Sequence, residues 1–479
     1  MKMKWLQWND KELLLKNEKQ IIFLEIVLCT LLLISVCFNN NVWWDEAYTY
    51  NLVANHSVWG MVMETAVDVH PPLYYLLAKV GAFLFGKSLL VQKMVVVVAA
   101  VCSMILGGTY VRERFGVKTS IAFIFLIAFA PQMAVYNVQL RMYSWAAFFT
   151  LGSAVYAYRI VLQDSKKNWC MFLFFSLCGA YTLYFAAVTI AFIYGFLLIH
   201  FLQQDRSRLK KWLVACGVTI LAYCPWLYMF VTISVPKFEG NTPNESLFVK
   251  GLFRDFWNWS FENGIHGDTF IYLGILMCSI VTLIVLKNRF GQGERFFVIV
   301  LLLSTVWTWF IGAVFTFMAG RSLLHRYMFS ALLLLWFGIA IIIGKYRNRV
   351  FYIFMAMMCI LGAYNYKFVY HDEYHIAPRI DVTEKFIEEN MHPDDLVVFE
   401  LEPYELMYQY YMPEQELVYY QNLDLGQHVG ESFWYIDAWG DYFSQEEIET
   451  YHIVKEEYGD FGIQSMDFKI YKITVNGNE

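Results

Sequence analysis

The amino-acid sequence predicts an α-helical polytopic membrane protein with a small soluble α/β domain at its C-terminal end. Three observations support this fold class. The chain is 58% hydrophobic with a mean hydropathy of +0.42, above the about 45–50% apolar content of soluble domains. Apolar runs near the length of about 20 residues that crosses a bilayer recur up to residue 369. The residues that follow are charged and rich in tyrosine.

The charge distribution divides the chain at the same place. From Tyr370 onward there are 25 acidic and 5 basic residues, a net charge of −20, whereas the preceding residues carry 31 basic and 17 acidic ones, a net charge of +14. We therefore predict a membrane domain over residues 1–369 and an acidic extracytoplasmic domain over 370–479. All nine cysteines lie in or beside apolar runs, without the spacing of a zinc site or a disulfide framework.

About 11 segments are expected to cross the membrane. The first, Ile21–Phe38, follows a lysine-rich start and has no small-residue cleavage site, so it is interpreted as an uncleaved transmembrane helix. The other expected spans are 94–111, 120–136, 142–162, 169–185, 186–203, 212–233, 269–286, 296–318, 327–344 and 350–368.

The connections between these segments predict the topology, because short cytoplasmic loops are enriched in Lys and Arg. All the basic connections fall on the side of the lysine-rich N-terminus if Leu73–Gly86 lies along the outer membrane surface instead of crossing. This interpretation leaves Lys87 and Lys93 outside. It predicts a cytoplasmic N-terminus and an extracytoplasmic C-terminal domain. The basic connections are 112–118, 164–167, 205–211, 287–295 and 345–349.

The acidic tail shows the patterns of a small α/β domain. Helical spacing is found in 381–390, and a second helix is expected in 403–411. Short apolar runs bounded by turn residues predict strands. These strands are 396–400, 417–420, 433–439 and 468–475.

The first outer loop, residues 39–93, concentrates acidic side chains of the kind that membrane proteins use for binding, ligation or proton transfer. The pair Asp45-Glu46 follows the first helix, and Asp68 comes 23 residues after Asp45, beside His70. Structural explanations stay open, since Asp45 could cap a helix and the prolines after His70 could begin one. A hard divalent cation would prefer the three carboxylates, and a softer one would add His70.

Two arginine clusters lie at outer ends of predicted helices, against the positive-inside bias. Arg141 and Tyr143 belong to the sequence RMYSW, whereas Arg321 and Arg326 flank the start of a later helix. An interfacial arginine can extend its head group to water, or it can bind an anion with its planar guanidinium. Two such clusters favour an anionic, membrane-embedded ligand such as a lipid phosphate.

The order of DE after the first helix, DVHPPL, RMYSW and RY resembles the polyprenyl-phosphate-sugar glycosyltransferases of the GT-C fold, glycosyltransferase family 39. This group includes enzymes like the dolichyl-phosphate-mannose protein mannosyltransferases and the aminoarabinose lipid A transferases. The resemblance covers the membrane domain and is strongest over residues 42–150. It implies a GT-C fold and transfer of a sugar from a polyprenyl-phosphate donor to a protein, lipid or glycan hydroxyl at the outer membrane face. No nucleic-acid partner is expected.

The resemblance also implies roles for the residues singled out above. Asp45 would act on the acceptor as base or orienting group, with Glu46 and Asp68 as helpers. Direct displacement at the anomeric carbon would invert its configuration. His70 would help to bind the acceptor or a metal ion, and the donor phosphate would be stabilised by the arginines. The expected substrate-binding residues are His70, Arg141, Tyr143, Arg321 and Arg326.

Some members of this group use a divalent metal ion, so the resemblance implies a metal site. Its expected ligands are Asp45, Asp68 and His70, with His266 as a further one.

Two other classes of protein fit the sequence less well. A lipid or polysaccharide transporter or flippase would show repeats and polar groups at mid-depth, whereas the ionisable residues here collect at one face. A receptor or assembly protein would leave the outer Asp and Arg clusters without a role. The sequence leaves open the sugar, the polyprenyl length and the acceptor.

Overall fold

The computed structural model describes residues 10–68, 70–234, 290–319, 325–371, 377–401, 404–438, 440, 443–463 and 466–477. By their mutual contacts, the residues form two compact units. The first unit is Met1–Cys37 with Ser57–Phe368, and the second is Phe38–His56 with Val369–Glu479. The segment 38–56, expected within the membrane domain, therefore groups with the C-terminal domain.

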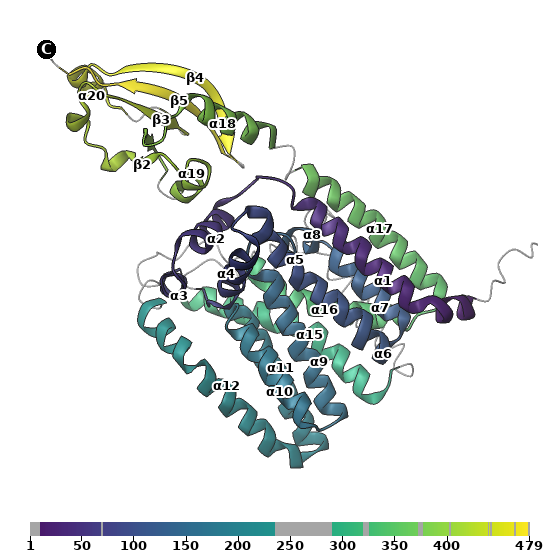
Figure 1. Ribbon diagram of the computed structural model, residues 1–479. Helices are drawn as coiled ribbons and strands as arrows, with labels where there is room; N and C mark the ends of the chain where they lie inside the picture. Colours follow the sequence, from purple (N-terminus) through teal and green to yellow (C-terminus); the bar gives the residue numbers. More distant parts are fainter. Residues whose placement is uncertain are drawn as a thin grey trace, which may run out of the picture. The chain divides into compact units, whose positions relative to one another are not determined.

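The first unit is a bundle of helices (Figure 1). Its elements are α1 (Asp10–Val36), α3 (Val58–Val67), α4 (Leu73–Phe85), α5 (Leu89–Leu106), η1 (Gly107–Val111), α6 (Arg112–Phe115), α7 (Val117–Phe129), α8 (Met133–Tyr136), α9 (Tyr143–Leu162), α10 (Lys166–Ala180), α11 (Tyr184–Gln204), η2 (Arg206–Arg208), α12 (Leu209–Met229), η3 (Phe230–Ser234), α15 (Gln292–Ala319), η6 (His325–Met328), α16 (Phe329–Gly344) and α17 (Asn348–Tyr370).

The predicted polytopic helical architecture is confirmed. Among the described residues, 8 helices are long and apolar enough to cross a membrane. The predicted spans at α7 and α10 form shorter helices, and the span expected at 269–286 lies outside the described residues. Helix α4 has 13 residues, about 20 Å of helix, which is too short for a hydrocarbon core of about 30 Å.

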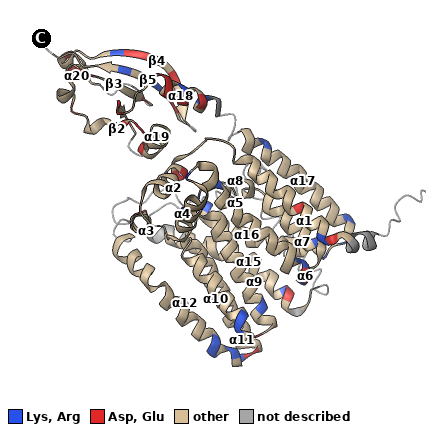
Figure 2. Cartoon of the chain, viewed as in Figure 1, with Lys and Arg blue, Asp and Glu red and all other residues tan. Residues whose placement is uncertain are grey.

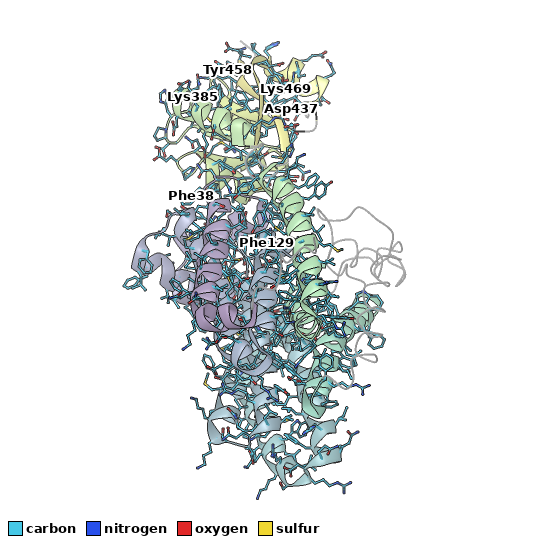
Figure 3. The ribbon with its side chains drawn as sticks, turned by 90° about the vertical axis from the view of Figure 1, so that its right-hand side faces the viewer. Phe38, Phe129, Lys385, Asp437, Tyr458 and Lys469 are labelled. Carbon is cyan, nitrogen blue, oxygen red and sulfur yellow. The ribbon has the colours of Figure 1, made fainter. Side chains whose placement is uncertain are left out.

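The core of this unit surrounds α16, which packs against α7, α9 and α15. Its apolar residues are buried on all sides, as expected for a helix enclosed by others. Phe337 contributes to an aromatic cluster, with its ring centroid 4.7 Å from Phe123 and 5.7 Å from Phe115. Phe129 of α7 is labelled among the helices in Figure 3.

Basic connections of the sequence meet at one end of the bundle. Arg114 Nη2 donates to the hydroxyl of Tyr158 near the end of α9, at 2.9 Å. Lys211 Nζ lies 2.5 Å from Asp164, which follows the same helix. Figure 2 shows Lys and Arg at the ends of α6, α11 and α12. Three of the predicted basic connections thus share one end, as the predicted topology requires.

The second unit contains a five-stranded sheet of order β2-β1-β3-β5-β4. Strand β1 is parallel to β2 and β3, whereas β5 is antiparallel to β3 and β4. The predicted small α/β domain is confirmed. Its elements are α2 (Trp44–Asn55), α18 (Ala377–Asn390), β1 (Leu396–Phe399), α19 (Glu405–Tyr411), β2 (Glu416–Tyr419), η9 (Tyr420–Asn422), η10 (Leu425–His428), β3 (Ser432–Asp437), α20 (Gln445–Tyr451), β4 (Val454–Ile463) and β5 (Met466–Thr474).

Both faces of the sheet are covered in part. On one face, Phe386 of α18 packs its ring 4.5 Å from Phe461 and 5.6 Å from Tyr458, which Figure 3 labels. The other face contributes Phe433 and Tyr435 to a core closed by residues 420–453. Phe433 and Tyr435 are two positions apart in β3 and share one face, which is the period of two expected of a strand.

Candidate active site

One polar cluster of the first unit joins three residues that the sequence had marked in two separate motifs. His70 Nδ1 lies 2.9 Å from Asp68 Oδ2 and 2.7 Å from the Asp68 carbonyl oxygen. His70 Nε2 lies 3.4 Å from Nη2 of Arg141. The exposed fractions are 8% for His70 and 2% for Arg141. The imidazole and the guanidinium are therefore largely shielded from bulk water.

These contacts define the hydrogen-bonding role of each ring nitrogen. Both Asp68 oxygens accept, so Nδ1 of His70 carries the proton and donates. Its Nε2 then holds a lone pair and accepts from Arg141. Asp68 fixes the tautomer and orientation of the ring, and the ring orients the guanidinium. A guanidinium oriented in this way suits a phosphate, because its N–H donors form a rigid fork.

The loop that carries Arg141 lies between α8 and α9 and is held by side chains. Asn137 Nδ2 donates to the carbonyl of Ile127 at 2.8 Å, and Ser144 Oγ donates to Asn137 Oδ1 at 2.9 Å. Tyr143 is fully buried, and its ring meets Tyr136 edge-on at 5.2 Å. The predicted site residue Tyr143 thus packs against Tyr136, so the two ends of the Arg141 loop are in contact.

The helix that follows the second arginine segment contacts the ring of Tyr136. Arg326 lies in η6, and Phe329 begins the helix that follows. The ring of Tyr136 lies 5.4 Å from that of Phe329. The helix that follows Arg326 therefore packs against Tyr136, which precedes the Arg141 loop. Two other residues that the sequence places at the outer membrane face, Arg321 and His266, lie outside the described residues.

Asp45 and Glu46 occupy the first turn of α2, in the second unit. Carboxylates are stabilised there by the positive end of the helix dipole. The N-cap residue is Trp43 and no side chain forms a capping hydrogen bond, so the helix-capping interpretation of Asp45 is not confirmed. Glu46 is 4% exposed, whereas Asp45 is partly exposed. The outer loop predicted as one segment is thus divided, with its acidic pair in one unit and Asp68 with His70 in the other.

The metal ligands expected from the sequence were Asp45, Asp68 and His70. Among the described residues, no three His, Cys, Asp or Glu side chains are grouped so as to hold a metal ion. In the first unit, both ring nitrogens of His70 have partners and one of these is the cationic Arg141. A guanidinium at this distance opposes a divalent cation by like charge. Asp68 and His70 therefore do not fit a metal site in this arrangement.

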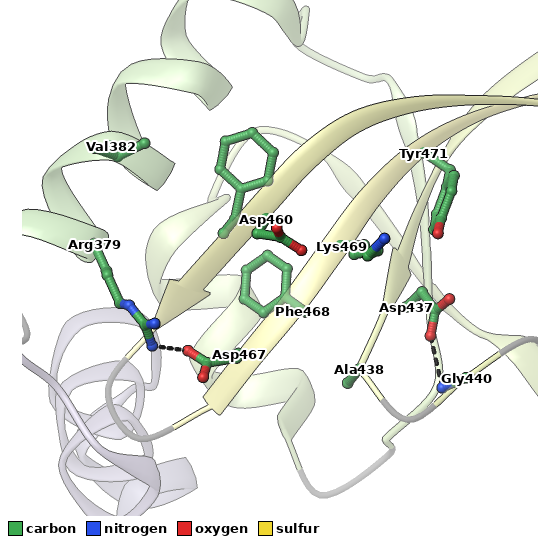
Figure 4. A pocket seen from close by; sticks show the side chains of 11 residues that line it. Arg379, Val382, Asp437, Ala438, Gly440, Asp460, Asp467, Phe468, Lys469 and Tyr471 are labelled. Atoms are coloured by element: carbon green, nitrogen blue, oxygen red, sulfur yellow. Dashed lines mark hydrogen bonds and ion pairs between the residues drawn. The ribbon is translucent and has the colours of Figure 1, made fainter.

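The second unit also contains a pocket that the sequence did not indicate, with a volume of about 810 Å³ (Figure 4). Asp437, Lys469 and Asp460 line it from three adjacent strands in register. Its two basic side chains are paired, Arg379 with Asp467 and Lys469 with Glu457. No sequence motif brings these strands together, and the pocket contains none of the predicted site residues.

Comparison with solved structures defines the class of fold. The crystal structure of ArnT from Cupriavidus metallidurans bound to undecaprenyl phosphate is similar over 95% of this chain and 98% of that chain, with 12% identity and a TM-score of 0.60. For the apo ArnT structure, the coverage is 96% and 99%, with 13% identity and a TM-score of 0.56. The chain therefore has the GT-C glycosyltransferase fold, which confirms the predicted fold class.

Residues 69–229 match the family model of dolichyl-phosphate-mannose-protein mannosyltransferases, in agreement with the resemblance found in the sequence. A cryo-EM structure of the arabinofuranosyltransferase AftD from Mycobacteria is also similar, with 13% identity and a TM-score of 0.50. The matched region spans 96% of this chain and 40% of the AftD chain. No curated protein matches this chain in sequence.

Proposed function

We propose that this chain is an integral membrane glycosyltransferase that moves a sugar from a polyprenyl-phosphate donor to an acceptor hydroxyl. The observation that carries the proposal is the buried guanidinium of Arg141, oriented by His70 and Asp68. It occurs in a chain with the fold of ArnT, which binds undecaprenyl phosphate in its solved structure. A preorganised guanidinium stabilises the negative charge that a leaving phosphate gains in the transition state.

In the proposed mechanism, Asp45 accepts the proton of the acceptor hydroxyl as the oxygen attacks the anomeric carbon. The new bond joins that carbon to the acceptor oxygen, and the bond to the phosphate oxygen breaks. The phosphate leaves with the bonding electron pair, stabilised by Arg141 and Arg326 together with Arg321. One base is enough because the phosphate leaves without acid assistance. Attack from the face opposite the phosphate inverts the anomeric configuration.

The proposal is tested with the purified chain in lipid nanodiscs and a synthetic polyprenyl-phosphate sugar. We expect release of polyprenyl phosphate, and of a glycoside of inverted configuration when a small alcohol is the acceptor. A flippase, which the comparisons do not favour, would move the intact lipid between leaflets without cleaving it. Intact donor after prolonged incubation with several acceptor classes would contradict the proposed function.

The proposed orientation places the C-terminal domain and the acceptor outside the cytoplasm. A reporter enzyme fused after Phe368 should read outside, and one inserted between Asp205 and Lys211 should read inside. The reason is the basic connections that share one end of the bundle and the charge of −20 on the tail. A tail reporter that is active only in the cytoplasm would contradict this topology.

A chelator is expected to leave the transfer rate unchanged. The cationic Arg141 beside His70 disfavours a divalent ion at that pair, so the donor phosphate is proposed to be held by arginine. The measurement is the rate after dialysis against EDTA, with and without added Mg²⁺ or Mn²⁺. A loss that added metal restores would overturn this expectation and support the metal site that the family resemblance implied.

A further inference from the structure

We infer that the C-terminal domain positions the catalytic base: Tyr411 and Gln409 of α19 hold both ends of the helix that carries Asp45. The inference rests on the proposed function, in which Asp45 is the base. Both helices belong to the same compact unit, although about 350 residues separate them in the sequence. The two residues are assigned a positioning role, because they act through α2 and not on the substrate.

The first attachment precedes α2. The hydroxyl of Tyr411 donates to the carbonyl of Asn40 at 2.9 Å and accepts from the backbone N–H of Val42 at 3.1 Å. Tyr411 is 7% exposed and Val42 is fully buried. A buried backbone group without a partner is costly, so this hydroxyl fixes the path of the main chain three residues before Asp45.

The second attachment lies near the C-terminal end of α2. Asn51 Nδ2 donates to Oε1 of Gln409 at 2.7 Å, and Gln409 in turn donates to Glu405 at 3.0 Å. The rings of Tyr50 and Tyr410 meet edge-on at 4.9 Å, an arrangement that aromatic pairs prefer. Helix α2 has 12 residues, about 18 Å of length, and one short helix therefore holds it near both ends.

The Tyr411 hydroxyl keeps its proton over the physiological pH range. Burial raises the pKa of Tyr411 well above its usual value, and the carboxylates of Glu384 and Glu46 raise it further, although the hydrogen bond from the Val42 N–H lowers it in part. The hydroxyl therefore donates and accepts at the same time, as the two backbone contacts require.

The position of α2 matters because a general base must lie within hydrogen-bonding reach of the proton it removes. A displacement of about 1 Å in such a group can cost about 100-fold in rate. Loosening either attachment is therefore expected to lower the catalytic rate, while affinity for the donor phosphate, assigned to Arg141 in the other unit, is retained.

The first test is Tyr411→Phe in the full-length protein, which removes the hydroxyl and keeps the ring. We expect kcat to fall about 10- to 100-fold, donor KM to stay unchanged, and amide hydrogen exchange in residues 42–49 to become faster. The matched control is Tyr420→Phe, because the Tyr420 hydroxyl donates to Glu447 at 3.4 Å, away from α2. The control should match wild type in all three measurements.

The second test exchanges the partners at the other attachment. Asn51→Ala and Gln409→Ala should each lower kcat, whereas the exchange Asn51→Gln with Gln409→Asn restores an amide pair of the same total length. Recovery of kcat in the exchange variant supports positioning. Recovery of folding without recovery of kcat contradicts it.

Hydrogen exchange separates this inference from the proposed function. If the wild-type protein transfers no sugar, the proposed function fails. Amide hydrogen exchange in the Tyr411→Phe variant still reports whether α19 holds α2. If wild type is active, unchanged exchange in Tyr411→Phe overturns the attachment. Faster exchange with an unchanged kcat overturns its role in catalysis.

Discussion

Replacing Asp45 by Asn is expected to lower the sugar-transfer rate by about 10²- to 10⁴-fold, the usual contribution of a general base. The amide keeps the shape and hydrogen-bonding capacity of the carboxylate but cannot take the acceptor proton. Donor affinity should stay close to wild type, since the phosphate is assigned to other residues. The measurements are transfer to a small alcohol and, separately, binding of the polyprenyl-phosphate sugar.

The matched control is Asp381→Asn, because Asp381 is an exposed carboxylate on α18 of the same unit. It should leave transfer unchanged. Glu46→Gln and Asp68→Asn should cause smaller losses than Asp45→Asn. Normal turnover by a correctly folded Asp45→Asn protein would remove Asp45 from the mechanism and leave it as a helix-start residue.

The second large effect is expected for Arg141→Ala, with a loss in transfer of about 10²- to 10³-fold, as for other groups that stabilise developing negative charge. Donor KM should also rise, because the phosphate is charged in the ground state. Arg141→Lys should recover only part of the activity, since an ammonium keeps the charge but lacks the planar fork. The measurement is a donor titration for each variant.

Arg114→Ala is the control for this effect, because Arg114 binds Tyr158 at the end of the bundle where basic connections meet. It should leave donor KM unchanged. His70→Ala is expected to resemble a mild Arg141 variant, since it frees the guanidinium to reorient. Wild-type donor use by Arg141→Ala would leave Arg141 with the interfacial role common to arginines at membrane boundaries.

Much of the fold could be predicted from hydropathy and periodicity alone. Helices such as α9 and α16 are long apolar runs, and the strands β1 and β3 are short buried ones. Strand β4 was missed because its sequence, VKEEYGDFGI, is charged and its pairing with β5 is interrupted by a bulge between Glu457 and Gly459. An edge strand exposed along much of its length has no apolar alternation to detect.

The site was only partly accessible to sequence reasoning. Asp68, His70 and Arg141 were each singled out, but their spacing suggested a metal site for the first two. The structure instead places Arg141 beside the second nitrogen of His70, a contact across 71 positions of the chain. Local spacing cannot reveal such a contact. The same holds for Tyr411 and Val42, which are 369 positions apart.

The attachment of α2 to α19 has a consequence for how the protein is made. Helix α2 leaves the ribosome about 350 residues before α19, or about 20–70 s earlier at about 5–20 residues per second. Until α19 follows, α2 lacks the helix against which it packs in the finished protein. On the proposed function, the nascent chain is inactive throughout this interval. A premature stop in the tail before α19 would therefore yield a protein that inserts into the membrane but transfers no sugar.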